Sequence, residues 1–193
     1  RVICLTLASL LFHVTAVHAQ QEVRVRGTIA AFDGKFLTVT ARNGGEVRAE
    51  LPDNVTVSTT RAFSLADIKP GMIMGVTTVK RADGALVAID VSPIPPTARQ
   101  GLSPYDLAPD STMTNAAVEG LVESTGGQTL PLNYQTGKGS VLVPPGTPTS
   151  QAAPGTRADL KAGEAVVLTA RQTETGLSIV RIQVAKDGVR PTQ

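Results

Sequence analysis

Apolar residues recur at every second position along this chain, in short runs that are separated by glycine-containing turns. In the first run, Val25, Gly27 and Ile29 share one face of a predicted strand, and Arg24 and Arg26 share the other. A helix would instead need apolar residues three and four positions apart. Glycine in the turns supplies the positive φ angles that tight hairpins require, so the pattern predicts β-hairpins. The turns of the first copy are Asp33-Gly34, Asn43-Gly44-Gly45 and Ala82-Asp83-Gly84.

The same order of motifs occurs twice, about 93 positions apart, which indicates an internal duplication. Each copy holds about five predicted strands and one short helical turn. The turn begins at Ser64 or Thr156 and has an aspartate three positions later, a spacing typical of a capping box. We therefore predict an all-β fold of two tandem small five-stranded barrels, each with one short helical turn. The matching segments are 25–27 with 118–120, 67–71 with 159–163, and 87–91 with 180–184.

Composition sets the expected domain boundaries. Five prolines interrupt the strand pattern after the first copy, because proline cannot donate a ladder hydrogen bond, and this stretch is expected to connect the modules. Within it, Tyr105 and Leu107 are expected to dock on a module surface. The Pro- and Gly-rich stretch 144–154 is expected to be a loop. The predicted boundaries are 1–19 for a signal peptide, 20–92 for module 1, 93–116 for a Pro-rich linker, 117–186 for a divergent module 2 and 187–193 for a tail.

An apolar run from Val2 to Val17 opens the chain and ends in Val17-His18-Ala19, which has small residues three and one positions before the predicted cut. We expect cleavage after Ala19 and a periplasmic or secreted protein. No later apolar run approaches the roughly 20 residues of a spanning helix, which excludes a permease. Both histidines and the only cysteine lie within the predicted signal. The predicted mature chain therefore lacks both residue types.

Several segments of the first copy carry a resemblance to a known family. They resemble a bacterial exported β-domain family of unknown function, whose members are small OB-like barrels that often occur in tandem. The resemblance covers about 23–92, with a weaker echo at 118–185. It implies a tandem pair of OB-like barrels and transfers no catalytic residue. The matching segments are Val25, Gly27 and Ile29, then 37–39, 65–71 and 87–91.

No reaction chemistry has a supporting motif. Without His and Cys, the usual ligands of zinc and copper(I) are missing, and no Ser-His pair can form. Met72 and Met74 lie two positions apart, which favours core packing over a thioether site for copper(I). Asp67 and Asp159 are interpreted as helix caps, with a catalytic role as the less favoured alternative. We predict no enzyme, no catalytic residue, no cofactor and no metal.

The charge balance limits the possible partners. The 18 basic and 16 acidic residues nearly balance, so nucleic-acid binding is only a distant alternative, carried by the OB-like resemblance. The sequence leaves two hypotheses open. One is a non-enzymatic envelope protein that binds an envelope protein, a glycan or a small molecule through loops or strand edges. The other is an accessory or sensor subunit of an envelope transport system, with a small ligand between the modules. The candidate binding residues are Arg24, Arg26, Arg48, Phe32 and Phe36.

Overall fold

The computed structural model describes residues 22–134 and 137–192, and these residues form an all-β protein with two short 3₁₀ turns. The predicted signal peptide lies outside the described residues. No helix in the described part of the chain has the length and apolar character needed to cross a membrane. The strands are β1 (Glu22–Phe32), β2 (Phe36–Ala41), β3 (Glu46–Glu50), β4 (Val57–Ala62), β5 (Ile73–Lys80), β6 (Leu86–Pro93), β7 (Gly101–Pro104), β8 (Thr112–Val118), β9 (Val122–Ser124), β10 (Gly127–Tyr134), β11 (Gly137–Val143), β12 (Ser150–Pro154), β13 (Ala165–Thr173) and β14 (Gly176–Val184), and the 3₁₀ turns are η1 (Leu65–Asp67) and η2 (Arg157–Asp159).

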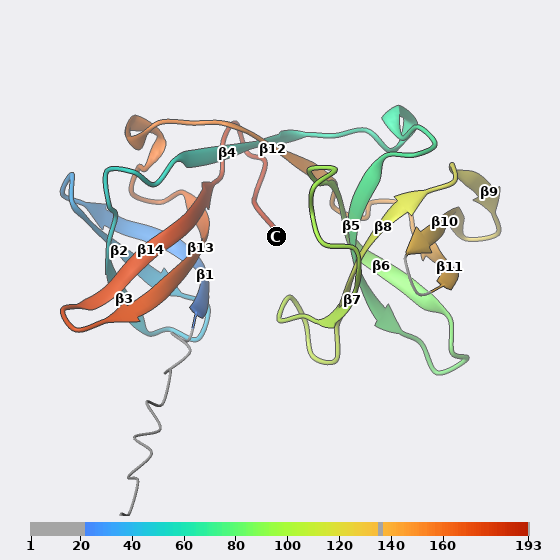
Figure 1. The fold of residues 1–193 in the computed structure, drawn as a ribbon, viewed down its shortest axis with the longest axis horizontal. Helices are drawn as coiled ribbons and strands as arrows, with labels where there is room; N and C mark the ends of the chain where they lie inside the picture. Colours follow the sequence, from blue (N-terminus) through green and yellow to red (C-terminus); the bar gives the residue numbers. More distant parts are fainter. Residues whose placement is uncertain (1–21, 135–136, 193) are drawn as a thin grey trace, which may run out of the picture.

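The strands form two sheets, and five strands of each sheet close into a ring (Figure 1). The first ring, here called barrel A, runs β1-β2-β3-β14-β13 and closes because β14 pairs with β3 as well as with β13. The second ring, barrel B, runs β8-β5-β6-β11-β10 and closes because β10 pairs with β8. Closure pairs the ring strands on both sides, so the outer strands of the two sheets are β12 in the first and β7 and β9 in the second.

Each barrel takes strands from both halves of the sequence. Barrel A combines β1, β2 and β3 with β13 and β14 from the other end of the chain, and barrel B combines β5 and β6 with β8, β10 and β11. The first half consists of three strands, a crossing strand, a 3₁₀ turn and a hairpin. The same order recurs in the second half, with the short strands β7 and β9 added. The predicted boundaries at 20–92 and 117–186 follow this repeat, whereas the two sheets cut across it.

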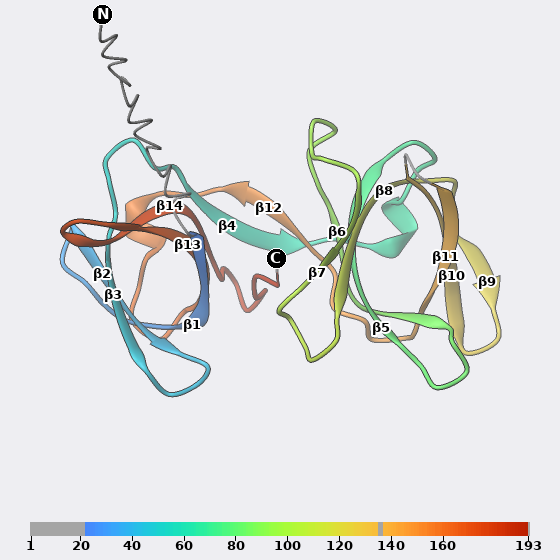
Figure 2. The ribbon, with the colours of Figure 1, turned by 60° about the horizontal axis from the view of Figure 1, so that its bottom comes forward.

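The exchange takes place along β4 and β12, which run between the barrels (Figures 1 and 2). The two strands pair antiparallel with each other over five residues, and β4 also pairs in parallel with β14. The stretch 144–154, which we expected to be a loop, therefore contains strand β12. The predicted linker 93–116 likewise contains β7 and the start of β8. Composition did not indicate β12 and β8 because they pair with β4 and β5, which are distant in sequence. Strand β7 has only four residues and pairs with the adjacent β8.

Two separate apolar cores fill the barrels. Ile29, Leu37 and Ile179 belong to the core of barrel A, and Met74 and Leu130 belong to that of barrel B; all five are at most 1% exposed. These cores consist mainly of aliphatic side chains, as the low aromatic content predicts. Packing of the aliphatic side chains is therefore the main source of stability in both barrels.

The 3₁₀ turns pack on the barrels as the sequence predicts. Ile68, after η1, belongs to the core of barrel B, and Leu160, after η2, belongs to that of barrel A. The turns end at Asp67 and Asp159, and a glycine with positive φ follows each end four residues later, Gly71 at 86° and Gly163 at 90°. Each turn thus lies on the barrel that receives the hairpin after it.

Candidate functional site

A cleft of about 690 Å³ lies between the two barrels and takes its lining from both of them. Barrel A contributes parts of β1, β13 and β14, barrel B contributes the end of β6 and parts of β7 and β8, and the crossing strands β4 and β12 contribute Ser58 and Ala152. The strand exchange therefore forms the cleft, because β4 and β12 connect the barrels beside it. We call this feature the interbarrel cleft.

The charge of the interbarrel cleft is positive. Its lining contains Arg24 and Arg181 and, among the described residues, no aspartate or glutamate. Arg181 is exposed on β14, and its guanidinium makes no hydrogen bond or ion pair with the described part of the chain. An unpaired cation in a concave site favours an anionic group on any molecule that enters it.

The remaining lining is half apolar and half polar, as in many small-molecule sites. Tyr105, Met113 and Ile94 supply apolar surface. Ser92 is 6% exposed, and its hydroxyl has no hydrogen-bond partner among the described residues. A buried hydroxyl without a partner carries a free-energy cost, which a ligand atom could relieve.

Two of the predicted binding residues, Arg24 and Arg26, come together at the edge of this cleft. Both guanidiniums bind the same carboxylate oxygen of Asp106 at 2.8 Å, and both lie over the Tyr105 ring, at 4.7 and 5.2 Å from its centroid. This contact confirms the expected docking of Tyr105 on a module surface. Since β1 belongs to barrel A and the β7–β8 loop to barrel B, the contact joins the barrels.

The ion pairs also set the protonation of Asp106. Partial burial acts to raise the pKa of its carboxyl group, but the hydrogen bond from Arg24 and the charges of Arg26 and Arg24 outweigh that effect. The pKa of Asp106 is therefore below its ordinary value. The carboxylate stays ionised at neutral pH and keeps both arginines in place.

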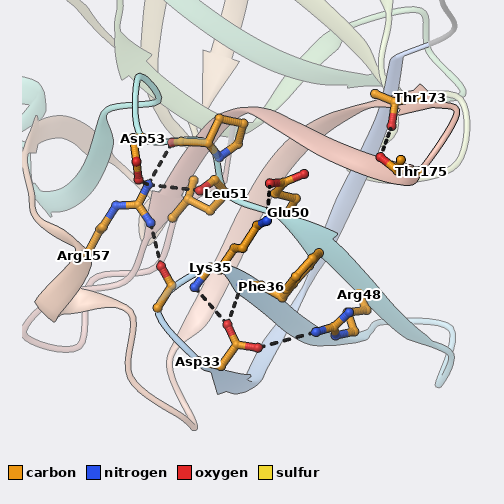
Figure 3. A network of polar contacts seen from close by, with 12 residues as sticks. Asp33, Lys35, Phe36, Arg48, Glu50, Leu51, Asp53, Arg157, Thr173 and Thr175 are labelled. Atoms are coloured by element: carbon orange, nitrogen blue, oxygen red, sulfur yellow. Dashed lines mark hydrogen bonds and ion pairs between the residues drawn. The ribbon is translucent and has the colours of Figure 1, made fainter.

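The other three predicted residues are not in the lining of the cleft and lie on β1, β2 and β3 of barrel A. Figure 3 shows two of them, Phe36 and Arg48, beside Asp33 of the β1–β2 turn. The Arg48 guanidinium lies 3.8 Å from the centroid of the Phe36 ring and 3.5 Å from the Asp33 carboxylate. Phe32 packs against the core of barrel A. The structure thus separates the five predicted residues into two groups. Arg48 and Phe36 contact each other, and Arg48 also contacts Asp33, so both predicted binding residues already have partners within the protein.

Arg157, on η2, is a structural residue of this region that sequence reasoning missed. Its guanidinium donates to the carbonyl oxygens of Gly34 and Leu51 at 3.0 Å and of Pro52 at 2.8 Å, and it contacts the Asp53 carboxylate at 3.2 Å (Figure 3). These bonds fasten the second half of the chain to turns of the first half. No local sequence signal marks Arg157, since its acceptors are mostly backbone carbonyls more than 100 positions away.

Of the two predicted caps, Asp67 does not act as one, because its side chain makes no hydrogen bond or ion pair with the described residues. The Ser64 hydroxyl oxygen caps η1 instead and accepts from the Ala66 N–H at 3.2 Å. The other candidates have structural roles. The Asp159 carboxylate accepts hydrogen bonds from the Thr156 backbone N–H at 2.8 Å and from the Thr156 hydroxyl at 3.2 Å, so it acts as a cap. Met74 is fully buried, and the Met72 sulfur accepts a bond from the Lys69 N–H at 3.2 Å. Within residues 22–134 and 137–192, no group of three or more His, Cys, Asp or Glu side chains is placed to hold a metal ion.

Sequence reasoning also missed Arg181 and Ser92, because each gains its significance only from the opposite barrel. Arg181 appears in sequence as an ordinary exposed strand residue, and Ser92 as the last polar position before a proline. Comparison with models of protein families, with curated proteins and with solved structures found no match to this chain.

Proposed function

We propose that this protein is a non-enzymatic binding protein that holds a small amphipathic anion in the interbarrel cleft. The observation that carries the proposal is the lining of the cleft: the unpaired cation Arg181, an unpartnered buried Ser92 hydroxyl, and apolar surface around Tyr105, with Arg24 held at the edge by Asp106. A molecule with a carboxylate or sulfonate at one end and an apolar body would satisfy all three. This proposal corresponds to the hypothesis of an accessory or sensor subunit with a ligand between the modules.

Binding without catalysis suits the chemistry of the lining. Its described residues include no histidine and no carboxylate, so none of the usual general bases faces the cleft. We further propose that the rings are small OB-like barrels and that the chain is exported, with cleavage after Ala19. Export would place the cleft in the periplasm or outside the cell, where it could bind a ligand for an envelope system.

The test uses 8-anilinonaphthalene-1-sulfonate, an amphipathic anion whose fluorescence rises in apolar sites. Arg181→Ala is expected to weaken its binding about tenfold, the loss of one charge-assisted contact. Ala152→Trp is expected to abolish binding, because exposed Ala152 lines the cleft and an indole there would fill it. Matched controls are Arg81→Ala, on the β5–β6 turn, and Ala158→Trp, an exposed position on η2. Unchanged binding by both cleft variants would refute the proposal.

A second candidate is a protein partner bound by strand addition, the first hypothesis from the sequence. Strands β7 and β9 are the outer strands of their sheet, and each carries an exposed aliphatic side chain, Leu102 at 50% and Val122 at 53%. Crosslinking of the exported protein in its native cell tests this candidate. A partner lost on Val122→Lys or Leu102→Lys, but retained on Ala152→Trp, would favour the strand edges over the cleft.

A further inference from the structure

A second cavity, of about 480 Å³, lies on barrel A and is distinct from the interbarrel cleft. Strands β1, β2 and β13 line it together with the segment that follows β14. Three arginines belong to its lining, one from β1, one from the β2–β3 turn and one from the C-terminal segment: Arg26, Arg42 and Arg190. We call it the arginine pocket.

Arg26 is the unusual member of this group. It is 7% exposed, yet its guanidinium has only one described polar partner, the bond from Nη2 to Asp106. Its Nε and Nη1 are buried without any hydrogen-bond partner among the described residues. Burying charged donors without acceptors is expensive, so such groups normally meet an acceptor. The unmet donors of Arg26 therefore indicate a missing acceptor at this pocket.

The other two arginines, unlike Arg26, have no carboxylate partner among the described residues. Arg42 lies beside Arg26, since its backbone N–H donates to the Arg26 carbonyl oxygen at 3.0 Å. Its guanidinium and that of Arg190 are exposed and make no ion pair or hydrogen bond with the described part of the chain. Glu164 is the one carboxylate among the described lining residues, so the lining side chains carry two net positive charges. The Asp106 carboxylate, which Arg26 shares with Arg24, lies outside the lining.

The C-terminal segment that carries Arg190 is fixed in place. The Thr60 hydroxyl donates to the carbonyl oxygen of Val189 at 2.5 Å, and the Thr192 hydroxyl donates to the carboxylate of Asp90 at 2.5 Å. These two bonds flank Arg190 and join its segment to β4 and β6. Arg190 is thus held at the pocket by its backbone, which lowers the entropy lost on binding.

We propose that the arginine pocket binds a tetrahedral oxyanion with two negative charges, of the phosphate or phosphate-monoester class. Two charges would balance the net charge of the lining, and oxygen acceptors would satisfy the free donors of Arg26. Guanidinium groups match the geometry of phosphate oxygens and bind them with charge-assisted hydrogen bonds. The hydroxyls of Thr28 and Thr40, also in the lining, can donate to further oxygens. This site is independent of the ligand proposed for the interbarrel cleft.

Isothermal titration of the full predicted mature chain, residues 20–193, with sodium phosphate and separately with glycerol 3-phosphate tests the proposal. The buffer is at about pH 7.5, where phosphate is mostly dianionic, and sodium chloride of equal ionic strength is the reference. We expect saturable binding at one site. Tighter binding of inorganic phosphate would identify a free anion as the ligand class, and tighter binding of glycerol 3-phosphate would identify a phosphate ester. Either result supports the site.

Variants locate the binding. Arg42→Ala and Arg190→Ala remove exposed side chains, so both should fold, and each is expected to weaken phosphate binding about tenfold. Arg81→Ala is the matched control and should bind as the unaltered chain does. Arg181→Ala should also retain phosphate binding, which separates this site from the interbarrel cleft. The proposal is overturned if chloride has the same effect as phosphate, or if both pocket variants bind phosphate normally.

Discussion

At the scale of single residues, Arg26 depends on one distant carboxylate. Its buried guanidinium has a described polar contact only with Asp106, 80 positions away, and the Tyr105 ring lies beside it. Removing Asp106 would leave a buried cation without any charged partner, whereas removing an exposed surface acid would not. The contact between β1 and the β7–β8 loop therefore rests on this one carboxylate.

We expect Asp106→Ala to lower the free energy of unfolding at pH 7 by about 1–2 kcal/mol, a modest value because Asp106 itself is half exposed. Urea unfolding measures the change. Asp67→Ala is the control, because exposed Asp67 has no side-chain hydrogen bond or ion pair with the described residues. Equal stability of the two variants would contradict the role given to Asp106.

Acid should remove the difference in unfolding free energy between the unaltered protein and Asp106→Ala. The pKa of Asp106 in the folded protein lies below its ordinary value of 3.8, so the unfolded chain takes up the proton first. The stabilisation is complete above that ordinary pKa and is lost as the pH falls through the folded-state pKa. The stability gap between the unaltered protein and Asp106→Ala should therefore close in that range. The shifted pKa values of Asp33 and Asp159 do not disturb this comparison, since both proteins contain them.

At the scale of single elements, the close approach of β1 and β2 depends on Gly27. A Cβ atom built at Gly27 would lie 2.1 Å from the carbonyl oxygen of Thr40 and 2.8 Å from a methyl carbon of Val39. Backbone atoms on the neighbouring strand cannot move aside as the end of a flexible side chain can. Gly27 therefore allows β2 to pair with β1 at this point in the barrel.

Gly27→Ala should destabilise the protein by about 2 kcal/mol, in the range of an overpacked core. Gly139→Ala is a matched control, because Gly139 also lies within a strand, and its added Cβ would meet only the Tyr134 side chain, the hydroxyl oxygen at 3.6 Å and a ring carbon at 3.7 Å. The control is expected to change stability by less than about 0.5 kcal/mol. Thermal unfolding followed by circular dichroism gives both values, and similar melting of the two variants would refute the steric argument.

Some strands and turns could be predicted from the sequence, and others could not. Alternating apolar residues and glycine turns correctly indicate an all-β chain, and Ser64 and Thr156 mark where the 3₁₀ turns begin. The turns end at Asp67 and Asp159, four residues before the predicted stops at Gly71 and Gly163. Strands β4 and β12 escaped prediction because serine, threonine, alanine and proline give no strong period-two pattern there. The candidate site escaped for a related reason. Arg181 and Ser92 become neighbours of a cleft only when two barrels face each other.

At the scale of the whole molecule, a repeated sequence leaves the connection between its halves undetermined. The strands of one copy present nearly the same pairing surfaces as their counterparts in the other, so β1 could pair with β5 of its own half or with β13 of the other. Local patterns are the same in both arrangements. The antiparallel pairing of β4 with β12 favours the exchange, because these hydrogen bonds form only when both strands cross between the barrels.

The exchanged arrangement can be tested by cutting the chain between its halves. A protease site inserted between Pro96 and Thr97, which are both exposed, would separate β1 to β6 from the remaining strands. We expect the two fragments to remain together in size-exclusion chromatography after cleavage. Six strand pairings join the two halves, β1 with β13, β3 and β4 with β14, β4 with β12, β5 with β8, and β6 with β11.

The control is the same cleaved sample in strong denaturant, where two separate fragments show that cleavage is complete. Two modules that each folded from one contiguous half would separate in native buffer, because only the cut linker would hold them together. Fragment 20–92 alone carries β1 to β6 but lacks β13 and β14, so barrel A cannot close in the arrangement described here. Because barrel A stays open, the fragment should be unfolded as a monomer or should exchange strands with a second copy of itself.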